Sequence, residues 1–255
     1  MARSGRRGRC WDERTKLARP ARPRPRLHPL ASARSGRASP RAPAEGDEQS
    51  QLSFEEARAG GGYGLTKWVA EHLVRRAGER GHPIAVYRPA MIAGHSRRGP
   101  GNPDDYVNRY LRACARSGRF LDASTERLDM TPVDFVAEGI VALFCSEPEG
   151  GATHHLTNLD QSMTYAELGR AMDRAGFPCA PSDYAAFRAA AVRPLGSPLR
   201  PLTAYFPESG FGLPMGPWPS ARTRAALSRL GVTCPSIDEP LMATYLQALV
   251  RRGLL

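Results

Sequence analysis

The sequence predicts an α/β protein with a mainly parallel sheet and a smaller, mainly helical lobe at its C-terminal end. Two observations support this fold class. Short apolar runs at residues 83–88 and 154–157 alternate with segments of helical period, which is the order that gives parallel βαβ units. After residue 160 the pattern consists of helices separated by loops rich in proline and glycine. We therefore expect a doubly wound sheet beside a helical lobe.

The chain divides by composition into three segments. Residues 1–44 hold 13 Lys and Arg against two acidic side chains, whereas residues 45–255 hold 23 of each sign. Because residues 1–44 are rich in Arg and Pro and have almost no large aliphatic side chains, they cannot offset their ordering entropy, and we predict disorder there. Residues 45–160 are expected to carry the sheet, and residues 161–255 the helical lobe.

The charge distribution and the cysteine pattern argue against several classes of protein. The formal charge of +11 belongs to the N-terminal segment. A neutral body favours a small-molecule enzyme over a nucleic-acid binder, although a basic nucleic-acid-binding arm remains an alternative for residues 1–44. Five scattered cysteines without a C-x-x-C pair argue against disulfides and structural zinc, so we expect reduced thiols in the cytoplasm and no metal site. No apolar run is long enough to span a bilayer.

The first predicted helix follows a capping box at Ser53-Phe-Glu-Glu56. Apolar residues then recur with helical period, and Gly78 and Gly81 end the pattern. The predicted apolar face consists of Leu65, Trp68, Val69, Leu73 and Ala77.

The remaining elements follow from apolar period, caps and breakers. The strand at residues 83–88 stops at Pro89. Thr131 is the expected N-cap of a helix with Pro132 at its first position, and a second capping box at Thr164-Tyr-Ala-Glu167 opens a helix that ends at Gly176. Further helices are expected at residues 104–116, 182–192, 220–230 and 238–251.

Tyr63 and Lys67 are the main candidates for chemistry. Their spacing places a phenol and an ammonium group on one face of the predicted helix. A lysine in that position would lower the pKa of the phenol and make it a usable proton donor or acceptor. The alternative is a surface pair without a function.

Several segments in a fixed order carry a family resemblance. They are Gly62-Tyr-Gly-Leu-Thr-Lys-Trp-Val-Ala-Glu71, Tyr87-Arg-Pro-Ala-Met-Ile-Ala-Gly-His-Ser96, Asp129-Met-Thr-Pro-Val-Asp134 and His155-Leu-Thr-Asn158. From about residue 60 onward the chain resembles the extended short-chain dehydrogenase/reductases, and more narrowly the thioester reductase domains of nonribosomal peptide synthetases and carboxylic acid reductases. Ala90 departs from the glycine usual in that family.

The resemblance implies a reaction, a cofactor and a partner. NADPH would reduce an acyl or peptidyl carrier thioester, releasing an aldehyde that some members reduce further to an alcohol. Tyr63 would be the catalytic acid, and Lys67 would also hold the nicotinamide ribose. The fold implied is a partial NAD(P)-binding Rossmann-type sheet.

The resemblance also implies binding roles along the next strand and loop. The backbone of Arg88 and Pro89, with Ala90 and Ile92, would pack against the nicotinamide. The acyl substrate would be bordered by His95, Ser96 and Met130.

The glycine-rich nucleotide turn of this family has no counterpart in the sequence. Only 62 residues precede Tyr63, and Gly5-Arg-Arg-Gly8 is followed by Trp11 in place of a third glycine. We therefore expect an N-terminally truncated domain, assign neither Ser35 nor Ser39 as the catalytic hydroxyl, and expect a partner over the exposed sheet edge. The alternatives are a non-catalytic remnant that binds a carrier protein and another extended reductase of the epimerase or dehydratase type.

Overall fold

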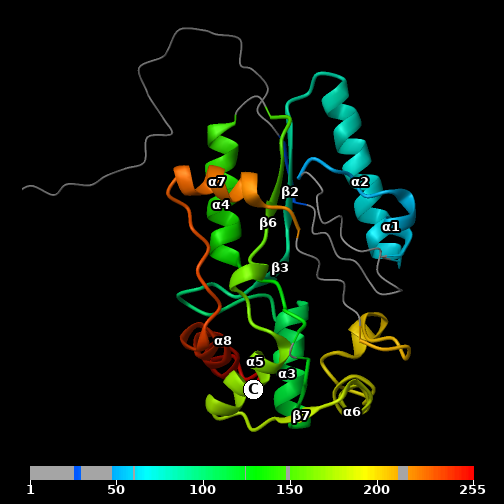
Figure 1. The fold of residues 1–255 in the computed structure, drawn as a ribbon, viewed down its shortest axis with the longest axis vertical. Coiled ribbons are helices and arrows are strands. Elements are labelled where there is room, and N and C mark those ends of the chain that lie inside the picture. Colours follow the sequence, from blue (N-terminus) through cyan, green and yellow to red (C-terminus); the bar gives the residue numbers. More distant parts are fainter. Residues whose placement is uncertain (1–25, 30–47, 60, 124, 148–149, 212–217) are drawn as a thin grey trace, which may run out of the picture.

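A three-stranded parallel sheet forms the centre of the molecule (Figure 1). The computed structural model describes residues 26–29, 48–59, 61–123, 125–147, 150–211 and 218–255. The strands are β1 (Arg26–Pro29), β2 (Ile84–Pro89) and β6 (Thr153–Leu156), and they lie in the order β1-β2-β6. Every strand pair is parallel, with Tyr87 opposite His154 in the β2–β6 register. The predicted α/β class is confirmed.

Helices cover both faces of this sheet because β2 is apolar on both sides. On one face Ile84 and Val86 pack against α2 (Gly61–Glu79), which follows the short helix α1 (Phe54–Ala59). On the other face Ala85 and Tyr87 pack against α4 (Val133–Ser146) and α7 (Ala221–Arg229). Figure 1 shows these two helical layers on opposite sides of the strands.

The predicted apolar face of α2 is not the face that meets the sheet. Ala70 and Val74 make that contact, whereas Val69 and Leu73 are 47% and 64% exposed. Gly78 explains the close approach, since a Cβ there would lie 2.9 Å from Ile84 Cγ1. Small residues therefore bring α2 close to the strand, and the larger apolar side chains point away from it.

The helical lobe has its own core, built around a group of aromatic side chains. Its helices include α3 (Tyr106–Ser117), α5 (Tyr165–Arg174) and α8 (Glu239–Arg251), and Tyr110, Tyr165 and Phe187 are fully buried between its elements. The lobe therefore includes α3, which precedes the boundary expected at residue 160. The remaining lobe elements are β4 (Arg119–Leu121), paired with β7 (Ala180–Ser182), α6 (Tyr184–Phe187), the π-helical turn η2 (Arg188–Val192) and η3 (Arg200–Tyr205).

Helix starts follow the expected chemistry in most places. Both capping boxes are present, at Ser53 and at Thr164. Asp105 caps α3 by accepting a hydrogen bond from Asn108 N at 2.7 Å. The expected N-cap at Thr131 is wrong, because Thr131 lies in strand β5 (Met130–Pro132), which pairs with β3 (Met91–Ala93), and α4 begins at Val133.

The N-terminal segment contributes one strand. Residues 26–29 form β1, so the prediction of disorder for residues 1–44 differs from the structure there; residues 1–25 and 30–44 lie outside the described residues. The short run Arg-Leu-His-Pro gave little sequence signal. Within the described residues β1 pairs only with β2. None of the described helices is long and apolar enough to cross a bilayer.

Candidate active site

Tyr63 and Lys67 lie at the N-terminal end of α2, where their side chains meet. Lys67 Nζ is 5.4 Å from the centroid of the Tyr63 ring, as expected for residues one helical turn apart. The phenol remains accessible, since Tyr63 is 42% exposed. Within the described residues, Lys67 forms no salt bridge with a carboxylate. The pair is therefore open to a ligand.

The pKa of Tyr63 differs from the sequence-based expectation. Burial raises it above the ordinary value of 10.0, and the nearby Tyr205 raises it further. This direction is opposite to the lowering that was expected from Lys67, whose ammonium lies over the ring as a cation–π partner. The phenol therefore stays protonated at neutral pH, which suits a proton donor.

Tyr205 is the residue of the helical lobe that affects the Tyr63 phenol. It ends η3, and its ring packs edge-on against Tyr106 with centroids 6.3 Å apart. Tyr106 in turn stacks on Phe206 at 6.0 Å. Tyr205 is therefore the member of this aromatic group that influences Tyr63.

The Arg88 guanidinium belongs to a buried ion pair. It contacts both carboxylate oxygens of Glu71 on α2, with Nε 3.1 Å from Oε2 and Nη2 bonded to Oε1. Its Nη1 donates to the Ser50 carbonyl and to His155 Nε2, each at 2.9 Å. The side chain is therefore fully engaged, and only the backbone of Arg88 is available for the predicted cofactor contact.

His155 continues this network to the far edge of the sheet. Burial and the charge of Arg88 lower its pKa to about 4, so the imidazole is neutral at neutral pH. Since Nε2 accepts from Arg88, Nδ1 donates to the Pro219 carbonyl at 2.7 Å. His154 points the other way, toward Thr223 and Glu147, as expected for adjacent residues of a strand.

The other predicted nicotinamide contacts lie at the end of β2 and just beyond it. Ala90 N donates to the Leu156 carbonyl at 3.0 Å, and Pro89 pairs with Leu156 in the sheet. Ile92 is partly buried against the apolar side chains of β2, α4 and α7. These residues form a firm backbone edge at the carboxyl end of the strand, which is where α/β folds bind ligands.

The predicted substrate residues have mainly structural contacts. Asp134 accepts from Ser96 N at 2.9 Å and from Ser96 Oγ at 2.5 Å, and His95 Nδ1 lies 3.4 Å from it. Burial would raise the pKa of Asp134, but the hydrogen bonds from Ser96 outweigh it and lower that pKa. Met130 is a correction: its side chain is fully buried in the lobe core and does not border an open site.

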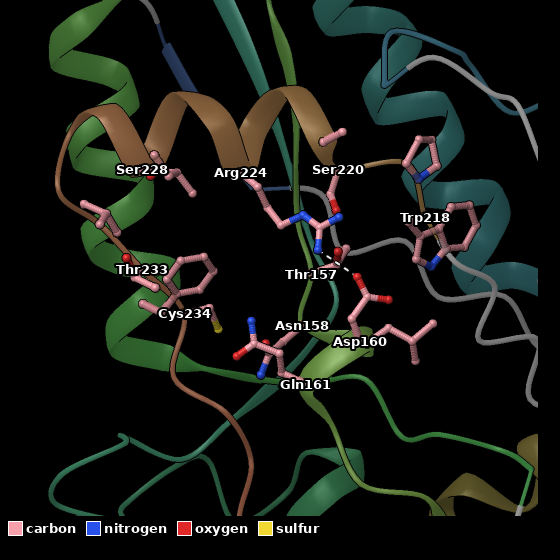
Figure 2. A pocket seen from close by; sticks show the side chains of 16 residues that line it. Thr157, Asn158, Asp160, Gln161, Trp218, Ser220, Arg224, Ser228, Thr233 and Cys234 are labelled. Carbon is pink, nitrogen blue, oxygen red and sulfur yellow. Dashed lines mark hydrogen bonds and ion pairs between the residues drawn. The ribbon is translucent and has the colours of Figure 1, made fainter.

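A cavity of about 490 Å³ lies at the carboxyl end of β6 (Figure 2). Its walls come from the 3₁₀ turn η1 (Leu159–Gln161), from α7 and from residues 232–234. Figure 2 shows Arg224 and Asp160 pointing toward each other, with Nη1 and Oδ2 2.7 Å apart. None of the predicted site residues lines this cavity, so it is separate from the Tyr63 site.

Comparisons with known proteins agree with this architecture. The NAD-binding family model described as "Male sterility protein" matches residues 19–140. The terminal R domain of the myxalamid PKS-NRPS pathway superposes with a TM-score of 0.72 at 36% identity, over 88% of this chain and 56% of that one. The chain belongs to the thioester reductase domains of the extended short-chain dehydrogenase/reductase superfamily.

Further relatives of this reductase domain are modular synthetases. The R domain of a nonribosomal peptide synthetase from Mycobacterium tuberculosis gives a TM-score of 0.62 at 28% identity, over 77% of this chain and 53% of that chain. The nonribosomal peptide synthetase FrzA from Cladobotryum sp is 33% identical over 213 residues, which are 75% of this chain and 20% of that protein. The chain therefore spans about half of the solved R domains and a fifth of that synthetase.

The described residues fit one end of a nicotinamide dinucleotide. Tyr63 and Lys67 present an accessible hydroxyl and ammonium for the ribose, and Pro89 and Ala90 present a backbone edge at the carboxyl end of β2. The pyrophosphate end has no matching turn, because the sequence lacks the family's G-x-x-G-x-x-G. The fit therefore supports a ribose contact and nothing beyond it.

Sequence reasoning missed the partners of several site residues in this reductase domain. Arg88 carried a usable signal, since an arginine inside a buried strand requires an acidic partner. No sequence signal pointed to Tyr205, because it lies 142 positions after Tyr63 and only the fold brings the two residues together.

Proposed function

We propose that this reductase domain reduces an acyl thioester held on a carrier domain to an aldehyde, with NADPH as the donor. The observation that carries the proposal is the open Tyr63–Lys67 pair at the N-terminal end of α2. The relatives among nonribosomal peptide synthetases support a carrier-bound substrate. Cys114, Cys179 and Cys234 are free thiols, which supports a cytoplasmic location.

Each residue of the pair has a distinct task. Tyr63 donates its phenolic proton to the carbonyl oxygen of the thioester as negative charge develops there. The raised pKa of Tyr63 keeps that proton available. Lys67 fixes the ring through its cation–π contact and offers its ammonium donors to the ribose hydroxyls. NADPH supplies a hydride to the carbonyl carbon when bound, and the carrier thiol leaves as the aldehyde forms.

The test is reduction of an acyl-pantetheine thioester followed by NADPH absorbance and aldehyde trapping. Tyr63→Phe should lower kcat by at least about 100-fold, because general acid catalysis contributes that much. Tyr184→Phe, at a half-buried tyrosine whose hydroxyl bonds the Pro207 carbonyl in the lobe, is the matched control and should retain kcat. Unchanged turnover by Tyr63→Phe would refute the proposed role. Parallel assays with NADH in place of NADPH show which of the two nucleotides is the hydride donor.

A non-catalytic carrier-binding module is the second candidate, and the relatives among nonribosomal peptide synthetases are compatible with it. It predicts carrier binding by the wild-type chain without NADPH oxidation, and equal carrier binding by Tyr63→Phe.

A further inference from the structure

Helix α3 presents an unbalanced row of arginines on its outer face. Arg109, Arg112 and Arg116 follow at spacings of three and four residues, which places them on one side of the helix. The opposite side is buried in the lobe core. From Tyr106 to Ser117 the helix contains no acidic residue.

The arginines influence one another and have little acidic compensation. Burial and the positive charges of Arg116 and Arg109 lower the pKa of Arg112. Arg112 Nε is buried and makes no hydrogen bond within the described residues. Asp104 pairs with Arg109 at 2.6 Å, and Asp105 is the half-buried N-cap of the helix. A net positive charge therefore remains on this face.

The neighbouring lobe segment extends the same surface. Arg109 Nη1 donates to the Pro198 carbonyl at 2.9 Å, which joins α3 to residues 193–200. Exposed Arg193 and Arg200 lie in that segment, linked by a bond from Arg200 Nη1 to the Arg193 carbonyl. Between them Leu195 is 87% exposed, which adds an apolar anchor to the cationic surface.

The surface begins close to the candidate active site. Tyr106 is the first residue of α3, and its ring packs against Tyr205. The charge of Tyr205 raises the pKa of Tyr63. At a rise of 1.5 Å per residue, Arg109 lies about 5 Å and Arg116 about 15 Å along the axis from Tyr106. A partner bound along these arginines would thus lie beside the approach to Tyr63.

We propose that Arg112, Arg116, Arg193 and Arg200, with Leu195, form the docking surface for an acidic carrier domain. The inference rests on the proposed function and names its partner surface. Arginine suits this task because its permanent positive charge attracts carboxylates and the phosphate of a phosphopantetheine arm. Complementary charge of this kind acts mainly on the association rate and on salt dependence.

The test measures binding of a phosphopantetheinylated acyl carrier domain to the full chain by biolayer interferometry. Arg112→Glu/Arg116→Glu should raise Kd about tenfold or more, mostly through a slower association rate. Arg76→Glu/Arg80→Glu, an exposed pair with the same spacing in the last turn of α2 and just after it, should bind like wild type. Arg112→Lys/Arg116→Lys keeps the charge and should stay near the wild-type Kd, which separates docking from folding defects. Leu195→Ser should weaken binding at all salt concentrations.

Equal Kd values for the two Glu double variants, or no carrier binding by the wild-type chain, would overturn the proposal. The proposal would also be overturned if Arg112→Glu/Arg116→Glu lost binding to a DNA oligonucleotide but kept carrier binding. The arginines would then serve nucleic acid and not a carrier domain. Tyr63→Phe tells the two proposals apart, since it should stop reduction and leave the carrier Kd unchanged. If Tyr63→Phe still turns over while the arginine variants lose binding, the catalytic proposal fails and the docking surface stands.

Discussion

Glu71 and Arg88 form a buried ion pair that ties the helix carrying Tyr63 and Lys67 to the central sheet. Their side chains are 13% and 10% exposed, and both carboxylate oxygens contact the guanidinium. Glu71 lies one turn after Lys67 and two turns after Tyr63 on α2. The pair therefore sets the position of the candidate catalytic residues relative to the end of β2.

Breaking this pair should destabilise the fold. Glu71→Gln leaves the Arg88 charge buried without a counter-ion, and we expect a loss of about 3 kcal/mol in the free energy of unfolding. Urea denaturation monitored by circular dichroism measures it. Glu79→Gln, at an exposed position on the same helix, is the control and should change stability little. A Glu71→Gln variant as stable as the control would contradict the structural role.

The same pair makes stability depend on acid pH. Burial alone would raise the pKa of Glu71, but the hydrogen bonds and charges of Arg88 and Arg75 hold it below the ordinary value of 4.5. Its contribution is thus present above pH 4.5 and lost as the pH falls through the lower folded-state pKa. The stability difference between wild type and Glu71→Gln should shrink below that pH.

His155 gives a second pH dependence in a different range. Its pKa falls from the ordinary 6.5 to about 4 in the folded protein. Between these pH values the imidazole is protonated in the unfolded chain and neutral in the folded one. Stability should therefore fall as the pH is lowered from 6.5 to 4, by on the order of 3 kcal/mol. In His155→Gln this part of the slope should disappear, whereas exposed His82→Gln should keep it. A slope that survives in His155→Gln would show that other groups cause it.

Gly169 allows α5 to pack closely on the lobe core. A Cβ at this position would lie 2.0 Å from Phe120 Cγ, and Phe120 is itself buried. Gly169→Ala should cost about 1–3 kcal/mol of stability through overpacking. Gly62→Ala, in α2 with no atom within 4 Å of the new Cβ, should instead stabilise by up to about 1 kcal/mol. Thermal unfolding of the two variants should thus shift in opposite directions.

Tyr205 should tune the acidity of Tyr63. Because the Tyr205 charge is one of two causes that raise the pKa of Tyr63, Tyr205→Phe should lower that pKa. The basic limb of the pH–rate profile should then move to lower pH. Tyr184→Phe provides the comparison, since its hydroxyl bonds the Pro207 carbonyl elsewhere in the lobe. An unmoved basic limb in Tyr205→Phe would remove Tyr205 from the site.

Local sequence signals predicted most helices and two of the three central strands. The capping boxes at Ser53 and Thr164 and the apolar run before Pro89 specify their elements through nearby residues alone. The prediction failed at β1 and at Thr131. A four-residue strand with one large aliphatic side chain has no periodicity to read, and Thr131 satisfies the rules for a helix cap while its tertiary partner, β3, makes it a strand residue.

The sequence by itself determined the α/β class, the placement of Tyr63 and Lys67 one turn apart, and the family that the ordered segments indicate. These follow from local spacing, which a helix converts directly into neighbouring side chains. Only the tertiary structure decided that Lys67 lies over the Tyr63 ring and that the Arg88 side chain is held in an ion pair with Glu71. It also decided that Tyr205 raises the pKa of the Tyr63 phenol. Burial and contacts between distant residues set those properties, and neither is encoded in the spacing of residues along one helix.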